Sequence, residues 1–310
     1  MSELFTQTAI IATMAAALRL AMPLLLAGLG EMYGQRSGVL NLGVEGVMLL
    51  GGFFAYWTTL ETENPWLGLV VGLAIGLIMG LLNGVISVTL KAEQGISGIG
   101  IFLFGLGFSD LLFQKIVKTP KLIDPLAKVE IPLLKEIPII GEFAFTQRSI
   151  VYLAFLLVPL SIWILNKTTF GLNVRAVGEN PAAADSLGVS VARTRYVTLA
   201  IGGLLAGAAG AGVVLTTGTF QQNFTSGKGF IAIALVYFGA WRPIGVMLGA
   251  LLFGFVEALV TQLKTLELIP VSQQDLANMA PALITVLALV VVSQRFKPPA
   301  ALTKPFSRGG

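Results

Sequence analysis

The side chains able to do chemistry are few, and the most informative of them are carboxylates set among apolar residues. The 310-residue chain has no His and no Cys, which excludes disulfides, thiol catalysis, imidazole metal sites and a His-based triad. Asn41 and Glu45 are four positions apart, so on a helix the two side chains would share one face. Asp110 and Glu257 also lie among apolar residues. Two roles are open to these two carboxylates: lining a path, or pairing with Arg19.

The composition is that of an integral membrane protein. Hydrophobic residues make up 55% of the chain, charged residues make up 12%, and the mean hydropathy is +0.85. Soluble proteins carry about 25% charged residues, so this chain has about half the usual share. The net charge of +4 comes from basic residues in short loops between apolar runs. That pattern indicates membrane topology and argues against binding of nucleic acid.

Nine apolar segments are candidates for membrane helices, because a spanning helix needs about 20 mostly apolar residues. We therefore expect an all-α, polytopic membrane protein with one membrane domain over residues 1–310. The seventh segment is too short to span, and we interpret it as a half-helix or as a helix that follows a loop dipping into the membrane. The candidate segments are residues 8–33, 39–58, 66–90, 96–117, 148–166, 195–216, 228–240, 243–263 and 278–295.

Orientation follows from the Lys and Arg residues of the short loops, which are enriched on the cytoplasmic side. The C-terminal tail carries Arg295, Lys297, Lys304 and Arg308 and no acid, so we place it in the cytoplasm. The loop 167–195 then also lies in the cytoplasm, and the N-terminus lies outside. The segment 118–147 falls outside although it holds four Lys, and we expect it to fold as a small external cap.

Glycine-interrupted stretches at 38–46, 95–100 and 216–229 predict broken or re-entrant helices. Irregular backbone at membrane depth persists only where protein or a water-filled cavity satisfies its polar groups, and transporters build substrate sites from such breaks. For Asn41 to Glu45 we favour a cavity, although Glu45 could also lie near the interface. Glu31 and Arg36 are interpreted as a simple interfacial ion pair. For Gly51, Gly52 and the glycines of 202–210 we favour close helix packing.

A short helix is predicted in the loop 167–195. Asn180 is a good N-cap, and Pro181 suits the first helical position. Three Ala follow, and Gly188 is placed to end the helix after about two turns. Because a short isolated helix is marginally stable, we expect it to dock on a partner. The chain has no phosphate-binding P-loop, since 226–229 (Ser-Gly-Lys-Gly) lacks the required spacing and hydroxyl.

Three blocks of the sequence resemble a known family. Residues 179–184 (Glu-Asn-Pro-Ala-Ala-Ala) resemble the cytoplasmic coupling helix of ABC importer permeases. Residues 30–46, together with 228–234 and 238–243, resemble the first-half and second-half signatures of permeases for nucleosides and simple sugars. The blocks fall in the family's order, and the resemblance covers residues 8–295. It is nearest to the shorter permease of bacterial nucleoside importers, with the fold of type II ABC importers.

The resemblance implies a transport subunit of the bacterial plasma membrane that is not an enzyme and needs no cofactor. Its implied partners are a separate ABC ATPase, a second and longer permease, an extracellular substrate-binding lipoprotein and a nucleoside. Simple sugars or branched-chain amino acids are the alternative cargo, and an ion-coupled secondary transporter is the alternative class. The implied substrate path comprises Asn41, Gly43, Glu45 and Ser97. The implied ATPase-coupling residues are Glu179, Asn180, Pro181, Ala183, Ala184, Leu187 and Gly188.

Overall fold

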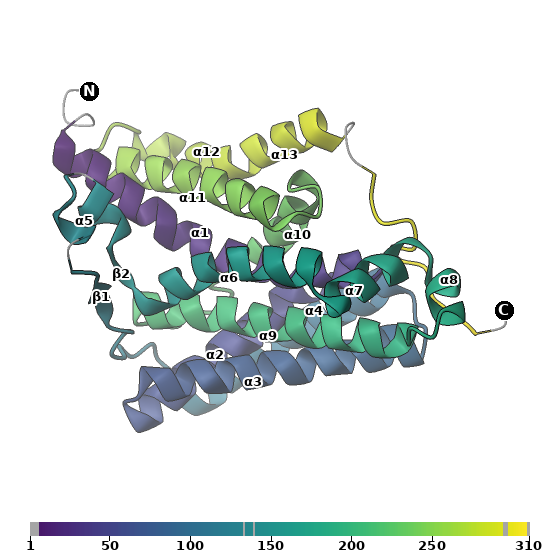
Figure 1. Ribbon diagram of the computed structural model, residues 1–310. Coiled ribbons are helices and arrows are strands. Elements are labelled where there is room, and N and C mark those ends of the chain that lie inside the picture. The colour runs from purple at the N-terminus through teal and green to yellow at the C-terminus, as the bar shows by residue number, and fades with distance from the viewer. Residues whose placement is uncertain (1–5, 133, 139, 294–296, 309–310) are drawn as a thin grey trace.

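Long helices that run side by side form most of the chain (Figure 1). The computed structural model describes residues 6–132, 134–138, 140–293 and 297–308. The main helices are α1 (Gln7–Arg36), α2 (Val44–Thr62), α3 (Pro65–Gly84), α4 (Gln94–Leu112), α6 (Ser149–Lys167), α9 (Val191–Thr217), α10 (Lys228–Phe238), α11 (Pro243–Thr265) and α13 (Ala280–Ser293). Single π-helical turns, Val85–Thr89 and Phe113–Val117, extend α3 and α4.

Each of the nine predicted segments overlaps one of these helices, but nine membrane crossings are not confirmed. In the described part of the chain, six helices are long and apolar enough to cross a membrane: α1, α3 and α4 with their π turns, α6, α9 and α11. Helix α10 has only 11 residues, which agrees with the expectation that the seventh segment is too short. The last predicted segment reaches residue 295, which lies outside the described residues. The protein is a multi-pass membrane protein.

Helix α9 is the central element, packed against α1, α2 and α3. Glycines allow the closest of these approaches, because a Cβ on Gly76 of α3 would lie 2.2 Å from the carbonyl oxygen of Gly203 in α9. A Cβ on Gly51 of α2 would likewise lie 2.7 Å from the Cα of Gly207. The packing interpretation of these small residues is therefore confirmed. Substitution by a larger residue at Gly76 would force α3 and α9 apart.

The segment 118–147 folds into a small unit at the end of the molecule where α1 begins (Figure 1). It contains strands β1 (Lys128–Glu130) and β2 (Thr146–Arg148), which pair antiparallel with Lys128 opposite Arg148. A 3-10 turn (Leu134–Glu136) and the short α5 (Ile140–Ala144) lie between them. Tyr56 of α2 holds the unit, since its hydroxyl donates to the carbonyl of Lys121 at 2.8 Å. That this unit faces the cell exterior stays a prediction.

The opposite end gathers the connections that are rich in Lys and Arg. It contains α7 (Thr169–Glu179), α8 (Pro181–Ser186) and the C-terminal tail, residues 297–308, which lies at the right-hand end of Figure 1. The remaining short elements, a 3-10 turn (Val271–Gln273) and α12 (Gln274–Asn278), connect α11 to α13. The predicted helix after Asn180 is present as α8, and Gly188 has the left-handed φ of +85° expected of a helix-ending glycine.

Candidate functional site

Two helices begin at breaks inside the protein, and these breaks fall in the glycine-interrupted stretches. Residues 39–41 are non-helical, and α2 begins only at Val44. The prediction that Asn41 and Glu45 share a helix face is therefore wrong. Asn41 instead lies in the turn before α2, where its Oδ1 accepts from the Gly43 amide at 2.9 Å. The left-handed φ of +90° at Gly38 redirects the chain before this turn.

Glu31 fixes the break before α2. Its side chain is 3% exposed, and its Oε1 accepts from the Asn41 amide at 3.0 Å and from Nε2 of Gln35 at 3.0 Å. The predicted interfacial pair with Arg36 is wrong, since the described residues show no ion pair between them and Nε of Arg36 is buried without a hydrogen-bond partner. The Glu31 carboxylate instead binds the backbone amide of Asn41. This amide is ten positions later in the sequence, and the turn before α2 brings it close.

Glu45 fixes the second break, the one before α10. Its side chain is 1% exposed. Oε1 accepts from the hydroxyl of Thr225 at 2.6 Å and from the Gly227 amide at 2.7 Å, and Oε2 accepts from the Gly229 amide. A carboxylate placed at the free N–H groups of a helix N-terminus is stabilising. Glu45, which lies in α2, therefore caps α10. This contact joins the first signature, residues 30–46, to the second, which begins at residue 228.

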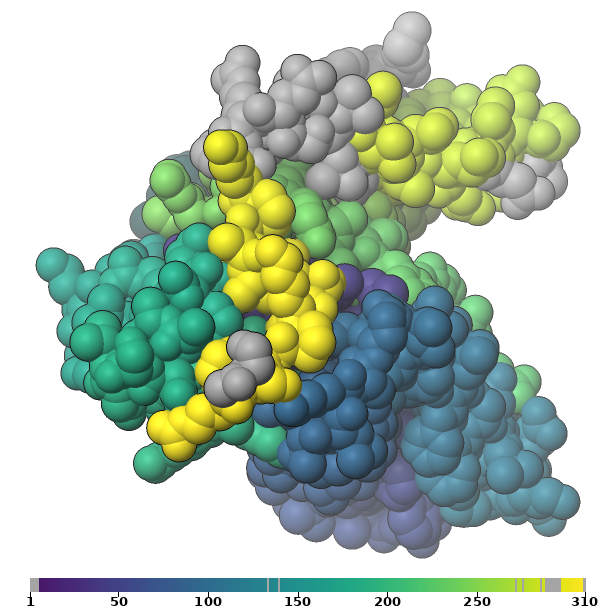
Figure 2. Space-filling view, turned by 90° about the vertical axis from the view of Figure 1, so that its right-hand side faces the viewer, coloured from purple at the N-terminus to yellow at the C-terminus, as the bar shows by residue number. Residues whose placement is uncertain are grey.

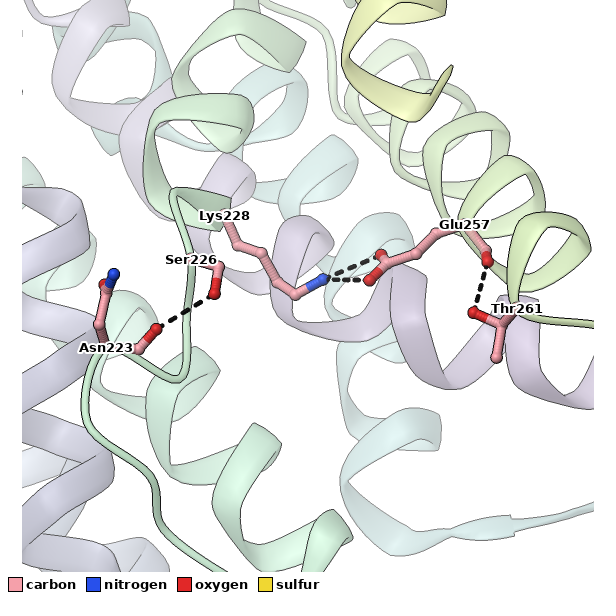
Figure 3. Close-up of polar contacts among 5 residues, drawn as sticks. All are labelled: Asn223, Ser226, Lys228, Glu257 and Thr261. Atoms are coloured by element: carbon pink, nitrogen blue, oxygen red, sulfur yellow. Dashed lines mark hydrogen bonds and ion pairs between the residues drawn. The ribbon is translucent and has the colours of Figure 1, made fainter. Parts of the chain in front are cut away.

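On the other side of the start of α10, Lys228 reaches Glu257 of α11 (Figure 3). Nζ of Lys228 lies 2.7 Å and 2.9 Å from the two carboxylate oxygens. The side chains are 15% and 27% exposed. The suggested pairing of Glu257 with Arg19 is not found, since the ion pair that Glu257 makes in the described residues is with Lys228. Sequence analysis missed Lys228, although an uncompensated Lys at the start of an apolar segment was a signal.

The residues between α9 and α10 lead directly into Lys228 at the start of α10. Asn223 and Ser226 are exposed, and the Ser226 hydroxyl donates to the carbonyl of Asn223 at 3.2 Å (Figure 3). The carboxylate of Asp110 in α4 lies close to the backbone of Asn223. A hollow of about 260 Å³ is lined by Val213, Thr217, Thr219, Gln221, Gln222, Asn223, Phe224 and Ser226. We call residues 218–227 the re-entrant segment.

The first turns of α4 pack on the break before α2. Oε1 of Gln94 accepts from the Leu40 amide at 2.8 Å. Glu93 caps α4, and the backbone amides of Ile96 and Gly95 that donate to its carboxylate hold the pKa of Glu93 below its usual value. Of the four residues predicted for the substrate path, Asn41, Gly43 and Glu45 are buried and Ser97 is half-buried. Their role in the path stays a prediction.

Helix α8 forms an exposed tip at the end of the molecule opposite the unit of residues 118–147. Oδ1 of Asn180 accepts from the Ala183 amide at 3.0 Å, as expected of an N-cap. Ala184 is buried and packs in a small apolar cluster with Val177 and Val191. The other predicted coupling residues point outward: Glu179, Asn180, Ala183, Leu187 and Gly188 are exposed, and Pro181 is half-buried. One side of α8 is therefore packed against the protein through Ala184, and its other side is exposed.

The C-terminal tail lies across this end of the molecule, as the yellow segment of Figure 2 shows. The Ala301 amide donates to the carbonyl of Gly178 at 2.8 Å, and the Thr303 amide donates to that of Gly38 at 3.1 Å. Arg195, which is 2% exposed, donates from Nε to the Ser37 carbonyl at 3.1 Å and from Nη1 to the tail. Sequence analysis assigned the tail only a side of the membrane and missed these contacts.

Comparison with known proteins identifies the family. Residues 13–292 match the family described as the branched-chain amino acid transport system permease component. This chain is a member of that family. The order of its signatures, the two helix breaks and the exposed α8 are consequently features of a transport-system permease.

Individual relatives agree with this assignment. The guanosine ABC transporter permease protein NupQ of Bacillus subtilis is 36% identical over 308 residues, 93% of this chain and 94% of NupQ. The putative glucose ABC transporter permease protein TsgC13 of Haloferax volcanii is 38% identical over 278 residues, covering 88% and 84%. The nucleoside ABC transporter permease protein NupC of Lactococcus lactis is 33% identical over 282 residues, covering 87% and 88%. No solved structure matches the chain.

Proposed function

We propose that this chain is the shorter membrane permease of an ABC importer for nucleosides in the bacterial plasma membrane. The assignment of nucleosides as the cargo rests on the likeness to NupQ, which covers 93% of this chain at 36% identity. NupC is a second similar nucleoside permease. The sequence contains no P-loop, which supports the proposal that a separate chain hydrolyses ATP. An extracellular lipoprotein delivers the substrate and supplies the affinity.

The proposed ATPase contact is α8. Its inner side is fixed by Ala184, and its exposed side presents Ala183 and Leu187, the latter 85% exposed. A hollow of about 700 Å³ lies next to it, lined by Thr169, Phe170, Asn173, Leu187, Gly188, Val189, Ser190, Arg193, Thr194 and Val197. A helix that is capped at both ends can transmit rigid-body movement from a closing ATPase to the membrane helices. ATP binding then shifts the permease between inward-open and outward-open states.

The proposed topology puts α8 and the C-terminal tail in the cytoplasm and the unit of residues 118–147 outside. The basic connections around Arg36, Lys91 and Arg242 support it, because they accompany α8 and the tail in the positive-inside pattern. Lys91, for instance, donates to Ser307 of the tail at 2.8 Å. A second, longer permease completes the membrane core. The substrate passes between the two permeases, beside the break that contains Asn41 and Gly43, the first turn of α2 with Glu45, and Ser97 of α4.

Glucose is the second candidate cargo, because the permease TsgC13 is 38% identical to this chain. The two cargoes can be separated with the complete importer expressed in cells that lack their own nucleoside and glucose uptake. We expect saturable uptake of radiolabelled guanosine that stops when the ATPase is inactivated and that excess glucose does not inhibit. Glucose uptake without guanosine uptake would overturn the nucleoside assignment. Guanosine uptake that survives ATPase inactivation and follows the membrane potential would instead indicate an ion-coupled transporter.

A further inference from the structure

The start of α10 has two sides with different chemistry. On the inner side, the carboxylate of Glu45 is buried and accepts three hydrogen bonds from the chain. On the outer side, the Lys228–Glu257 pair is partly exposed and has Asn223 and Ser226 on the adjoining re-entrant segment (Figure 3). Building on the proposed function, we propose that the outer side, Asn223, Ser226, Lys228 and Glu257, lines the translocation path and contacts the uncharged, hydroxyl-rich nucleoside.

The ion pair lies deep in the membrane span. Glu257 is 14 residues after Pro243 and 8 residues before Thr265, the two ends of α11. At a rise of about 1.5 Å per residue, this puts it roughly 21 Å from one end of the helix and roughly 12 Å from the other. Lys228 is the first residue of the short α10, and its Nζ contacts Glu257. Helix α10 therefore begins within the length of one lysine side chain of Glu257.

Partial exposure at that depth restricts what the pair can face. Charged side chains within a membrane span face the bundle interior or a water-filled cavity, because contact with lipid is costly. The Lys228 and Glu257 side chains retain 15% and 27% of their accessible surface. Neighbouring residues of the re-entrant segment line the hollow of about 260 Å³. A partly exposed ion pair that adjoins a polar segment lining a hollow is the setting expected of an aqueous path.

The chemistry of this outer side suits a neutral polar solute. One ammonium and one carboxylate at 2.7 Å bring no net charge, so the site has no excess attraction for anions such as nucleotides. Carboxylate oxygens accept hydrogen bonds from ribose hydroxyls, and the Asn223 amide has both donors and an acceptor for a base edge. Glu45 positions these groups from behind, because it holds the backbone at Gly227 and Gly229.

The first test uses the fact that the chain has no Cys, so a single introduced thiol is the only one on this subunit. Ser226→Cys in the complete importer, in native membranes, is treated with a charged, water-requiring methanethiosulfonate reagent. The matched control is Leu156→Cys, which is 65% exposed in the middle of α6 and surrounded by apolar residues. We expect Ser226→Cys to react at least about 10-fold faster and its reaction to block transport. Equal rates would overturn the proposal.

The second test distinguishes a Lys228–Glu257 pair that contacts the substrate from one that only stabilises the structure. Glu257→Gln should lower the maximal rate of guanosine uptake about 10-fold while co-purification of the subunits persists. The double variant Lys228→Glu with Glu257→Lys restores the pair with reversed polarity. A purely structural pair would be rescued by this exchange, and such rescue would overturn the proposal. Continued loss of uptake in an assembled double variant supports a contact with substrate.

These experiments also distinguish this inference from the proposed function. The unsubstituted importer is assayed first for guanosine uptake, and its failure would remove the nucleoside assignment alone. The reactivity contrast between Ser226→Cys and Leu156→Cys needs no nucleoside. It therefore decides whether this side of α10 faces water even if the cargo proves to be a different polar solute.

Discussion

Glu45 and Glu257 both bind residues at the start of α10 and differ in almost everything except residue type. Glu45 is 1% exposed and takes its hydrogen bonds from the segment that leads into the helix. Glu257 is 27% exposed and is held by one Lys. A carboxylate occupied by backbone amides fixes the chain, whereas one that shares a partly exposed ion pair remains available to a solute. Acids inside membrane helices are therefore distinguished by their partners rather than by their depth alone.

The largest expected effect is that of Glu45→Ala. It leaves the amides of Gly227 and Gly229 and the hydroxyl of Thr225 without their acceptor. A buried donor left without its acceptor costs about 1–3 kcal/mol, and three donors lose their acceptor here. We expect a loss of at least about 3 kcal/mol in the free energy of unfolding and little purified complex. Thermal unfolding in detergent and the yield of assembled importer measure this.

Glu257→Ala is the matched control for that change, because it removes the same side chain from the other side of α10. Because the Lys228–Glu257 pair is partly exposed to the proposed path, water can solvate the Lys228 ammonium that remains, so the complex should assemble and lose less stability than Glu45→Ala does. Similar losses of stability for the two variants would break the distinction between a fixing carboxylate and an available one.

A smaller effect is expected from Glu31→Ala, which removes two hydrogen bonds at the break before α2. A buried donor left without its acceptor costs about 1–3 kcal/mol, and we expect a loss of about 2–3 kcal/mol in thermal unfolding experiments. Arg36→Gln is the control. Because Arg36 forms no ion pair with Glu31 among the described residues, it should change stability much less. Equal losses would restore the interfacial pair that the sequence suggested.

The sequence predicted best what is local. The cap at Asn180 and the glycine at Gly188 need only neighbouring residues, so α8 was found with its ends. Glu45 was predicted as a residue of the substrate path, which stays a prediction, and its hydrogen-bond partners, 180 or more positions away, could not be found from any local pattern. Glu31 was assigned the nearest charge in the sequence, whereas the turn before α2 brings it a backbone amide instead. Lys228 was overlooked because its partner is on another helix.

The lengths of the helices show the same limit. Each of the nine predicted segments overlaps a helix, although nine membrane crossings are not confirmed, and α2 starts at Val44 rather than at residue 39 because of the break before it. Hydropathy reports which residues avoid water. The residue at which a buried helix begins depends instead on which groups accept hydrogen bonds from its first backbone amides. At α10 that partner is a side chain from α2, which a sequence alone does not disclose. The candidate site was therefore found by region, and its geometry was not.

The same contrast between fixed and available sides applies to α8. Ala183 is exposed, whereas Ala184 is buried. Ala183→Arg should leave thermal unfolding of the permease unchanged but reduce binding of the ATPase at least about 10-fold, or about 1.4 kcal/mol, because the larger charged side chain fills the contact surface. Co-purification and titration of the ATPase measure this. Ala183→Ser is the control and should bind normally. Undiminished binding by Ala183→Arg would move the contact away from α8.

The smallest effect is expected where the tail meets α8. Arg308 is 81% exposed in its side chain and pairs with Asp185 at 2.9 Å, and such surface pairs contribute about 0–1 kcal/mol. Arg308→Ala should therefore change neither thermal unfolding nor uptake measurably. Ala301→Asp is the comparison, since Ala301 is 3% exposed and its amide holds Gly178. A charge placed there is buried without a partner, so the tail should detach and become sensitive to protease. If Arg308→Ala detached the tail as well, its anchoring would lie in the exposed pair instead of the buried backbone contacts.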